Sequence, residues 1–306
     1  MESSQTKYLI SIVGPTAIGK TNLCIALAKR FDAEIFSNDS RQFYHEMKIG
    51  TAVPTKEELK AVKHHFIQHT SIHDTYTVGD FERDALQKLE QYFRKKTIAF
   101  LVGGSGLFER ALTEGLDHFP TIDAAIRTTL NKEFEDLGIE PLQQELAEKD
   151  PEYYEQVDLH NGKRVIRALE IIRGTGEKFS SFRTQTKANR SFEIIKIGLE
   201  LPREELYQRI NLRVDQMMDE GLLEEAKSLY PLRHLNALQT VGYRELFDYF
   251  DGKIDLELAI EEIKKNTRRF AKRQMTWFKK DEAVQWFSPK DFDSILAYIQ
   301  KQIHIR

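Results

Sequence analysis

A glycine-rich segment constrains the fold more than any other part of the chain. It reads Gly14-Pro15-Thr16-Ala17-Ile18-Gly19-Lys20-Thr21. The apolar run at 8–13 predicts a buried strand, and the apolar spacing of 22–30 predicts a helix. Strand, G-x-x-x-x-G-K-T and helix in this order are the context of a phosphate-binding loop. We therefore expect an α/β fold: a parallel sheet of the P-loop NTPase type, flanked by helices.

The residue types of this loop suit an anion. Glycines let consecutive backbone N–H groups turn towards a phosphate, and the positive end of the following helix dipole points to the same place. Lys20 would supply charge to the outer phosphate oxygens, and the Thr21 hydroxyl can ligate Mg²⁺. We expect residues 14–21 to bind a phosphorylated ligand with Mg²⁺ as cofactor. A glycine-rich turn without a ligand is the weaker alternative, because pattern and context agree.

Length and composition limit the classes of function. A chain of 306 residues can hold an α/β core and a second, smaller module. The net charge of −3 gives no global signature of nucleic-acid binding, so such a surface must come from local clustering. Cys24 is the only cysteine, which excludes an internal disulfide and fits a small buried side chain. With no signal peptide or long apolar run in the sequence, we expect a cytoplasmic monomer without a membrane partner.

Polar residues follow two more predicted strands. Asn38-Asp39-Ser40-Arg41-Gln42 comes after a strand at 33–37, where open α/β sheets bind their ligands. These side chains could instead only cap the next segment. The strand at 97–102 ends in Gly103-Gly104-Ser105-Gly106, without the magnesium-binding acid of many P-loop ATPases. This weakens a motor or switch function.

The remaining segments predict an inserted module and a helical end. Residues 44–80 lack a clear period and predict a long loop. Its histidines favour solvated or locally bonded imidazoles over a metal site; they are His64, His65, His69 and His73. Residues 117–190 are helical and highly charged, so we expect a module there between core segments 1–116 and 191–306. Expected helices lie at 80–94, 123–137, 141–149, 163–173, 204–220, 222–229, 243–249, 256–280 and 291–303, with a fourth strand at 194–201 and a mobile stretch at 179–190.

Positive charge gathers at 264–280, which holds eight basic residues and no acid. Ile263, Phe270 and Trp277 are seven apart, so we expect one stripe to pack inward and the cations to face out. A second basic cluster is expected from Arg164, Arg167, Arg183 and Arg190. Aromatic residues interleaved with cations suit RNA, although a solvated face would show similar charges.

The chain resembles the tRNA dimethylallyltransferase family, also called tRNA isopentenyltransferases, nearly from end to end. Three motifs are together specific to that family: Asp-Ser-Arg-Gln at 39–42, Arg-Ala-Leu-Glu at 167–170 and Lys-Arg-Gln at 272–274. Further matching segments are 14–21, 49–52, 64–65, 102–107 and 242–245. Phe43 and Phe108 depart from the common Val and Tyr, and without a Cys/His zinc finger the chain is similar to bacterial members.

The resemblance implies a reaction and roles for single residues. Dimethylallyl diphosphate would bind the phosphate loop, and its dimethylallyl group would pass to N6 of the tRNA adenosine 3′ of the anticodon (position 37), releasing pyrophosphate. Asp39 would be the general base, with Lys20, Arg213 and Ser105 also in the catalytic site. The tRNA contacts implied are Asp39, Ser40, Arg41, Gln42, Ser105, Arg127, Lys163, Arg164, Val165, Ile166 and Arg167. Ser105 stands where the family usually has Thr, so its hydroxyl is retained.

Two other functions would use the same loop. A kinase of nucleotides or small molecules would bind ATP there, and a non-catalytic RNA-binding protein would keep the loop as a vestige. Formation of an N6 adduct on tRNA separates the transferase from both.

Overall fold

The computed structural model describes residues 5–183 and 187–304. Contacts divide the chain into two compact units: the core, Met1–Glu114 with Asn189–Arg306, and the insert, Gly115–Ala188. These bounds lie within two residues of the ones expected from the sequence. Within the described residues, no helix has both the length and the apolar character needed to cross a membrane.

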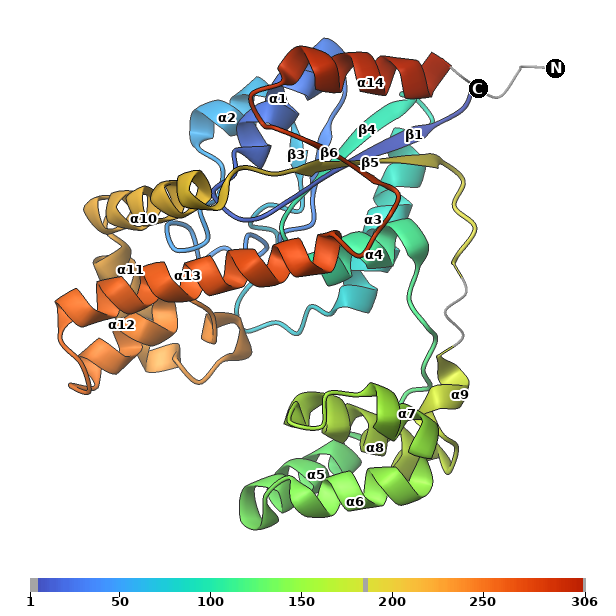
Figure 1. The fold of residues 1–306 in the computed structure, drawn as a ribbon, viewed down its shortest axis with the longest axis vertical. Coiled ribbons are helices and arrows are strands. Elements are labelled where there is room, and N and C mark those ends of the chain that lie inside the picture. The colour runs from blue at the N-terminus through green and yellow to red at the C-terminus, as the bar shows by residue number, and fades with distance from the viewer. Residues whose placement is uncertain (1–4, 184–186, 305–306) are drawn as a thin grey trace. The chain divides into compact units, whose positions relative to one another are not determined.

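The core is built on a parallel sheet of six strands (Figure 1). In spatial order they are β3 (His64–His65), β2 (Ile35–Ser37), β4 (Ile98–Val102), β1 (Tyr8–Val13), β5 (Glu193–Leu199) and β6 (Val284–Phe287). The α/β fold class is confirmed, as are the four predicted strands, whereas β3 and β6 were not predicted. β1 lies between β4 and β5, so later strands of the chain are added on both sides of the first strand. In open α/β sheets, ligands bind at the carboxyl ends of the strands where the strand order reverses in this way.

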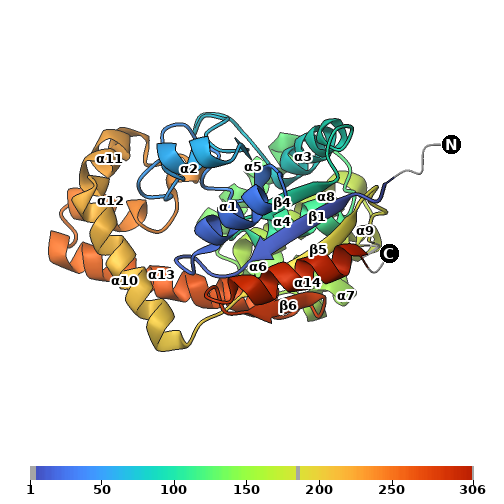
Figure 2. The same ribbon diagram turned by 90° about the horizontal axis from the view of Figure 1, so that it is seen from above.

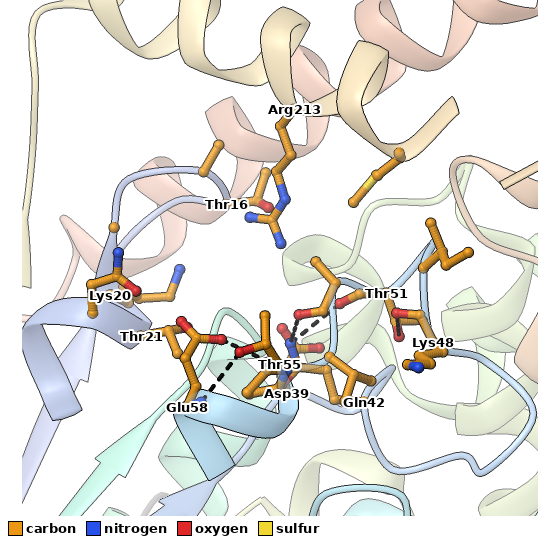
Figure 3. Close-up of a pocket in the computed structure, with 18 of the residues that line it drawn as sticks. Thr16, Lys20, Thr21, Asp39, Gln42, Lys48, Thr51, Thr55, Glu58 and Arg213 are labelled. Carbon is orange, nitrogen blue, oxygen red and sulfur yellow. Dashed lines mark hydrogen bonds between the residues drawn. The ribbon is translucent and has the colours of Figure 1, made fainter. Parts of the chain in front are cut away.

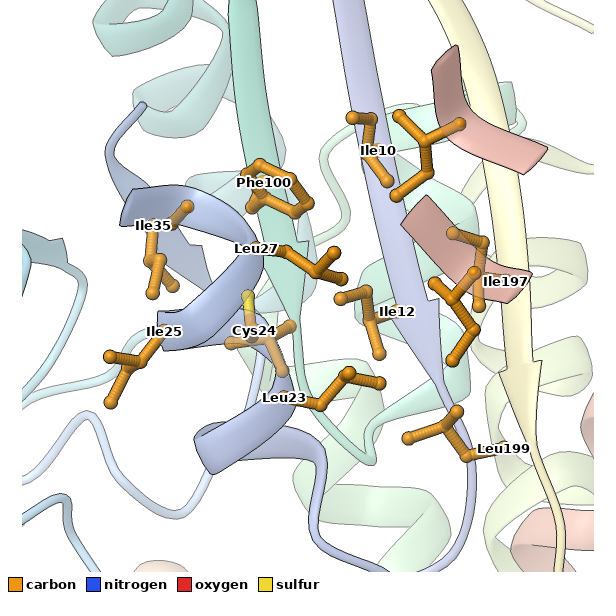
Figure 4. Packing of buried hydrophobic residues seen from close by; sticks show 14 of the residues in the cluster. Ile10, Ile12, Leu23, Cys24, Ile25, Leu27, Ile35, Phe100, Ile197 and Leu199 are labelled. Carbon is orange, nitrogen blue, oxygen red and sulfur yellow. The ribbon is translucent and has the colours of Figure 1, made fainter. Parts of the chain in front are cut away.

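Helices cover both faces of the sheet (Figures 1 and 2). α1 (Lys20–Arg30) and α14 (Phe292–His304) pack on one face, where Ile10, Ile12 and Cys24 are fully buried (Figure 4). α3 (Val78–Tyr92) and α4 (Gly106–Glu114) pack on the other face, against Leu9 and its neighbours. Alternate residues of β1 therefore enter opposite layers, which explains why its sequence is continuously apolar.

The segment at 44–80 has more regular structure than predicted. It contains α2 (Lys56–Ala61), β3 and a bridge between Tyr44 and Thr70. Thr55 and Glu58 form a reciprocal capping box at the start of α2, a Thr-x-x-Glu signal that is visible in the sequence. Most of the segment before α3 is irregular, as expected, and the two short elements were missed because neither is long enough to show a period.

A second apolar cluster supports the helical end of the core. It joins α10 (Arg203–Asp219), α11 (Leu222–Leu229), α12 (Tyr243–Phe250) and α13 (Leu256–Phe278). The predicted inward stripe on α13 is wrong: Ile263 is buried, but Phe270 and Trp277 are 39% and 38% exposed. Further along α13, Ala271, Gln274 and Phe278 are buried instead, because the buried face turns around the helix as its neighbours change from α12 and α10 to α4.

The insert has its own apolar core. It consists of α5 (Ala124–Leu137), α6 (Glu140–Lys149), α7 (Pro151–Gln156), α8 (Gly162–Thr175) and α9 (Phe179–Phe182). The expectation of a mobile stretch is wrong for residues 179–182, which form α9. Phe179 is buried, and the Ser180 N–H and hydroxyl both donate to the Asp150 carboxylate. Residues 184–186 of that stretch lie outside the described part. Arg190 belongs to the core, where it pairs with Glu82, so the second basic cluster does not include it.

A buried ion cluster ties β5 to α4 and the segment after α13. The Lys196 ammonium lies 2.6 Å from Asp281, 3.2 Å from Glu114 and 3.5 Å from Glu109. Lys196 and Glu109 are 7% and 4% exposed. Burial raises the pKa of Glu109, and the Lys196 charge opposes that rise. The cation is therefore what allows these carboxylates to lie together.

Replacing Lys196 with Met should reduce the free energy of unfolding by about 3–5 kcal/mol at pH 8, the usual scale for breaking a buried pair. A carboxyl group whose pKa is raised by folding stabilises the fold below its unfolded pKa and loses that contribution as the pH rises through its folded pKa. The loss in Lys196→Met should therefore be smaller at pH 5 than at pH 8, measured by urea denaturation. Lys63→Met, which removes an exposed partner of Glu34, should cost less than about 1 kcal/mol. Equal losses in the two variants would contradict the buried role of Lys196.

Candidate active site

A cavity of about 910 Å³ opens where three neighbouring strands end. β1 leads into the phosphate loop, β4 into Gly103, and β2 towards Asp39, and all three segments line the cavity (Figure 3). Residues 48–59 and α10 complete the wall. Apolar side chains of residues 48–59, α10 and α13 also line it: Ile49, Val53, Leu59, Leu212, Met217 and Phe270.

The phosphate loop presents an open helix N-terminus. α1 begins at Lys20, and its N-cap residue, Gly19, makes no side-chain hydrogen bond to the first turn. The first N–H groups of a helix have no intrahelical partner, so they remain available to an anion. The Lys20 ammonium donates to the carbonyl oxygens of Gly14 at 3.0 Å and Pro15 at 2.8 Å. Burial lowers the pKa of Lys20 to about 8, with the Arg213 charge adding to this effect and Asp39 opposing it.

Two arginines of α10, one turn apart, reach the same region. Arg209 donates to the Ile18 carbonyl oxygen of the phosphate loop and pairs with Glu205. The Arg213 guanidinium points into the cavity (Figure 3), and no hydrogen bond joins it to another described residue. Burial lowers the pKa of Arg213, partly offset by Asp39. A half-buried cation without a hydrogen-bonded partner is poorly solvated, so Arg213 is suited to an anionic ligand.

Asp39 faces this cation across the cavity. Its Oδ1 accepts the Arg41 N–H at 3.1 Å, and its own N–H donates to the Ser37 hydroxyl. These local bonds fix the backbone where β2 ends, while the side chain lines the cavity with Lys20 and Arg213. The structure thus brings together three of the four residues expected in the catalytic site.

The fourth, Ser105, is engaged elsewhere. Its hydroxyl accepts the Ser40 N–H at 3.1 Å and lies 3.0 Å from the Ser40 hydroxyl. Ser40, Arg41 and Ser105 do not line the cavity. Arg41 donates to the Ala237 carbonyl oxygen. The Ser40–Ser105 bonds fix the polar segment after β2 against the turn after β4, and Arg41 fixes it against Ala237.

Gln274 of α13 connects the phosphate loop to that turn. Its Oε1 accepts the Thr16 N–H at 2.9 Å, and its Nε2 donates to the Gly104 carbonyl oxygen at 2.8 Å. Gln274 is 6% exposed, and a side-chain carbon at Gly104 would collide with its Nε2. The Lys-Arg-Gln motif is visible in the sequence, but no role for Gln274 follows from it, because nothing in the local pattern links positions 258 residues apart.

A carboxylate holds the loop that closes the cavity, residues 48–52, here called the clamped loop. Glu225 accepts the N–H groups of Lys48, Ile49 and Gly50 at 2.8–3.1 Å and the Tyr243 hydroxyl at 2.6 Å. A side-chain carbon at Gly50 would lie 2.6 Å from the Tyr243 ring, so only glycine fits there.

From the other side, the Gln42 amide donates to the carbonyl oxygens of Thr51 and Ala52 (Figure 3). The clamped loop is therefore bonded through both its N–H and its C=O groups. Gln42 was expected to contact tRNA, and in the structure its side chain binds the clamped loop.

The insert carries the remaining expected tRNA contacts. Lys163 and Arg164 are exposed, and Arg127 and Arg167 both donate to Glu170 at 2.9 Å. Val165 and Ile166 are 0% and 4% exposed and lie in the apolar core of the insert. On α8 these two side chains occupy the inward face and the cations beside them the outward face, so the structure leaves Val165 and Ile166 only their backbone for the expected contact with tRNA.

Oxygen donors suited to Mg²⁺ are present beside the loop. No hydrogen bond joins the Thr21 hydroxyl to another described residue, and Thr21 shares the cavity with Asp39. The described residues contain no group of three or more His, Cys, Asp or Glu side chains that could enclose a metal. Mg²⁺ typically keeps few protein ligands and shares phosphate oxygens, so this donor set fits it.

Two of the histidines of residues 44–80 have local hydrogen-bond partners. The His65 ring is bonded to the Glu34 carboxylate at 2.6 Å, and the His64 ring is bonded to the Val62 carbonyl oxygen at 2.8 Å.

Tyr243→Phe tests the clamped loop. It keeps the ring against Gly50 and removes only the hydroxyl bond to Glu225, so amide hydrogen exchange at 48–50 should accelerate about tenfold, the scale of one hydrogen bond to a charged group. Tyr249→Phe in the same helix, where no such bond is present among the described residues, is the control. Unchanged exchange in Tyr243→Phe would show that the bond does not restrain the loop.

Comparisons with known proteins agree with this geometry. A family model described as IPP transferase matches residues 42–281. The chain is 58% identical over 300 residues to the tRNA dimethylallyltransferase of Christiangramia forsetii, covering 98% of this chain and 99% of that one. For the Flavobacterium johnsoniae enzyme of the same name, the values are 55%, 97% and 98%.

Two solved structures have the same fold. The tRNA isopentenylpyrophosphate transferase of Bacillus halodurans superposes with a TM-score of 0.73 at 38% identity, over 97% of both chains. A eukaryotic dimethylallyltransferase acting on tRNA gives 0.78 at 27% identity, over 94% of this chain and 75% of that one. The chain belongs to the IPP transferase family, that of the tRNA dimethylallyltransferases.

Proposed function

We propose that this chain transfers the dimethylallyl group of dimethylallyl diphosphate to N6 of the adenosine next to the anticodon on its 3′ side, position 37 of tRNA, and releases pyrophosphate. The observation that carries the proposal is the composition of one cavity: a phosphate loop and Arg213 for the anion, an apolar wall for the hydrocarbon, and Asp39 as an acid facing both.

The reaction exchanges one bond for another. The N6 amine attacks the first carbon of the allylic group, the bond from that carbon to oxygen breaks, and pyrophosphate leaves with the electron pair. An adenine amine is a weak nucleophile because its lone pair is delocalised. The Asp39 carboxylate orients it and accepts the proton that N6 loses. The target base must leave its stack to reach this site, as in other enzymes that modify bases.

Charge that develops on the leaving group meets donors that are already in place. The first N–H groups of α1, the Lys20 ammonium and the Arg213 guanidinium surround the position of the diphosphate, and such preorganised groups stabilise a transition state. When Mg²⁺ is bound, Thr21 would hold it, and the ion supplies charge neutralisation to the phosphate oxygens. Exposed Lys163 and Arg164, with Arg127 and Arg167, would bind the RNA backbone.

Asp39→Asn tests the base. The amide keeps an oxygen for the Arg41 N–H, so the local backbone should persist, while the chemical step should slow by about 10²-fold or more. Single-turnover formation of the N6 adduct, quantified by nucleoside mass spectrometry, gives the rate, and a filter-binding assay gives the affinity for tRNA. Glu57→Gln, at an exposed carboxylate of the same cavity, should leave both unchanged. A loss of tRNA affinity as large as the loss of rate would contradict the role of Asp39, and ATP turnover without an adduct would favour a kinase.

Pyrophosphate affinity tests Lys20. Because its pKa is about 8, the amine becomes neutral as the pH rises from 7 to 9, and binding of the anion then requires uptake of a proton. Affinity measured by calorimetry should therefore weaken with pH above about 8, approaching about tenfold per unit. Lys20→Arg should remove this dependence, whereas Lys48→Met, at an exposed lysine of the same cavity, should retain it. The same pH profile in wild type and Lys20→Arg would exclude Lys20 as the titrating group.

A further inference from the structure

The insert contains an acid at the point where its RNA-binding cations meet. Glu170 on α8 is 6% exposed, and its Oε2 accepts one hydrogen bond from Arg127 on α5 and one from Arg167 on its own helix, both at 2.9 Å. Two nitrogens bonded to one oxygen can lie at most about 5.8 Å apart, twice that distance. Two guanidinium groups repel each other at such a separation unless a negative charge lies between them.

The Glu170 carboxylate engages only some of the hydrogen-bond donors of the two arginines. Their side chains are 46% and 40% exposed, and each gives Glu170 a single Nη1 donor out of the five N–H donors of a guanidinium. The Arg167 guanidinium also lies over the Phe119 ring, 5.6 Å from its centre. The acid is therefore buried, while both cations keep exposed surface and N–H donors that Glu170 does not engage.

We propose that Glu170 is a positioning residue that holds Arg127 and Arg167 as a preformed pair for the phosphates of tRNA. This inference rests on the proposed function of the chain. Glu170 does not touch the RNA; it removes the repulsion between the arginines and limits their rotamers before binding, so less conformational freedom is lost when the phosphates arrive.

Charge alone predicts the opposite sign. Glu170→Gln removes a negative charge from an RNA-binding surface, so a purely electrostatic account predicts tighter binding. If Glu170 positions the arginines, the same change should weaken tRNA affinity about tenfold, the scale of one lost hydrogen bond to a charged group. Glu177→Gln removes an exposed carboxylate just beyond the end of α8 and should leave affinity unchanged or slightly tighter.

Glu170→Asp separates geometry from charge. It keeps the net charge of the wild type but shortens the side chain by one methylene, so it cannot hold both arginines, and tRNA binding should weaken as in Glu170→Gln. In both variants we expect the KM for tRNA to rise, with the kcat at saturating tRNA and the KM for dimethylallyl diphosphate unchanged. Thermal unfolding checks that the insert stays folded.

A double-mutant cycle closes the test. In a chain that already carries Arg127→Gln and Arg167→Gln, Glu170→Gln should have no further effect on tRNA affinity, because it acts only through the arginines. Tighter binding in Glu170→Gln, wild-type affinity in Glu170→Asp, or an undiminished effect in the double arginine variant would overturn the inference. Failure of the wild-type chain to form any N6 adduct would instead overturn the proposed function.

Discussion

The side-chain amide of Gln274 holds the two substrate-facing turns of the core at a fixed separation. A carboxamide has one accepting and one donating end, and each end has a single backbone partner here: the Thr16 N–H and the Gly104 carbonyl oxygen. The partners dictate which end is which, so neither a carboxylate nor an apolar side chain of the same size could satisfy both. The phosphate loop, the turn after β4 and the basic helix α13 therefore share one anchor.

Poorly solvated charge is used differently in the two units. In the core, Lys20 and Arg213 are positive groups in a poorly solvated cavity, and the lowered pKa of each records the cost of that placement. This cost is offset when an anion enters. In the insert the buried group is the acid, Glu170, and the cations reach solvent. The first arrangement suits a small enclosed anion, and the second suits an extended polyanion at a surface.

The sequence predicts what is encoded locally. The phosphate loop, the first strand and the long amphipathic helices follow from patterns within about 15 residues, and the family resemblance adds Asp39 and Arg213. The two-residue strand β3 and the short helix α2 carry too little periodicity to be recognised. Which side of a helix is buried depends on neighbours distant in sequence, which explains the errors at Phe270 and Trp277.

Contacts between positions distant in the sequence likewise could not be predicted from local patterns. Glu225 bonds to backbone groups 175–177 residues away, and Arg127 meets Glu170 across 43 positions. Val165 and Ile166 belong to a motif that matches the family, but matching a motif does not say whether a side chain or only the backbone is accessible. The assignment of roles by resemblance therefore identifies segments more securely than individual side chains.

The clamped loop has a consequence for how a molecule can lie in the cavity. All three N–H groups of 48–50 are directed to Glu225, so this wall offers no backbone donors there and presents aliphatic surface from Ile49 and Val53. The opposite wall, at the start of α1, is rich in donors. An amphiphile with a charged head and an apolar tail thus meets a chemically polarised cavity, which has free backbone donors on the side of α1 and aliphatic surface from Ile49 and Val53 on the other side.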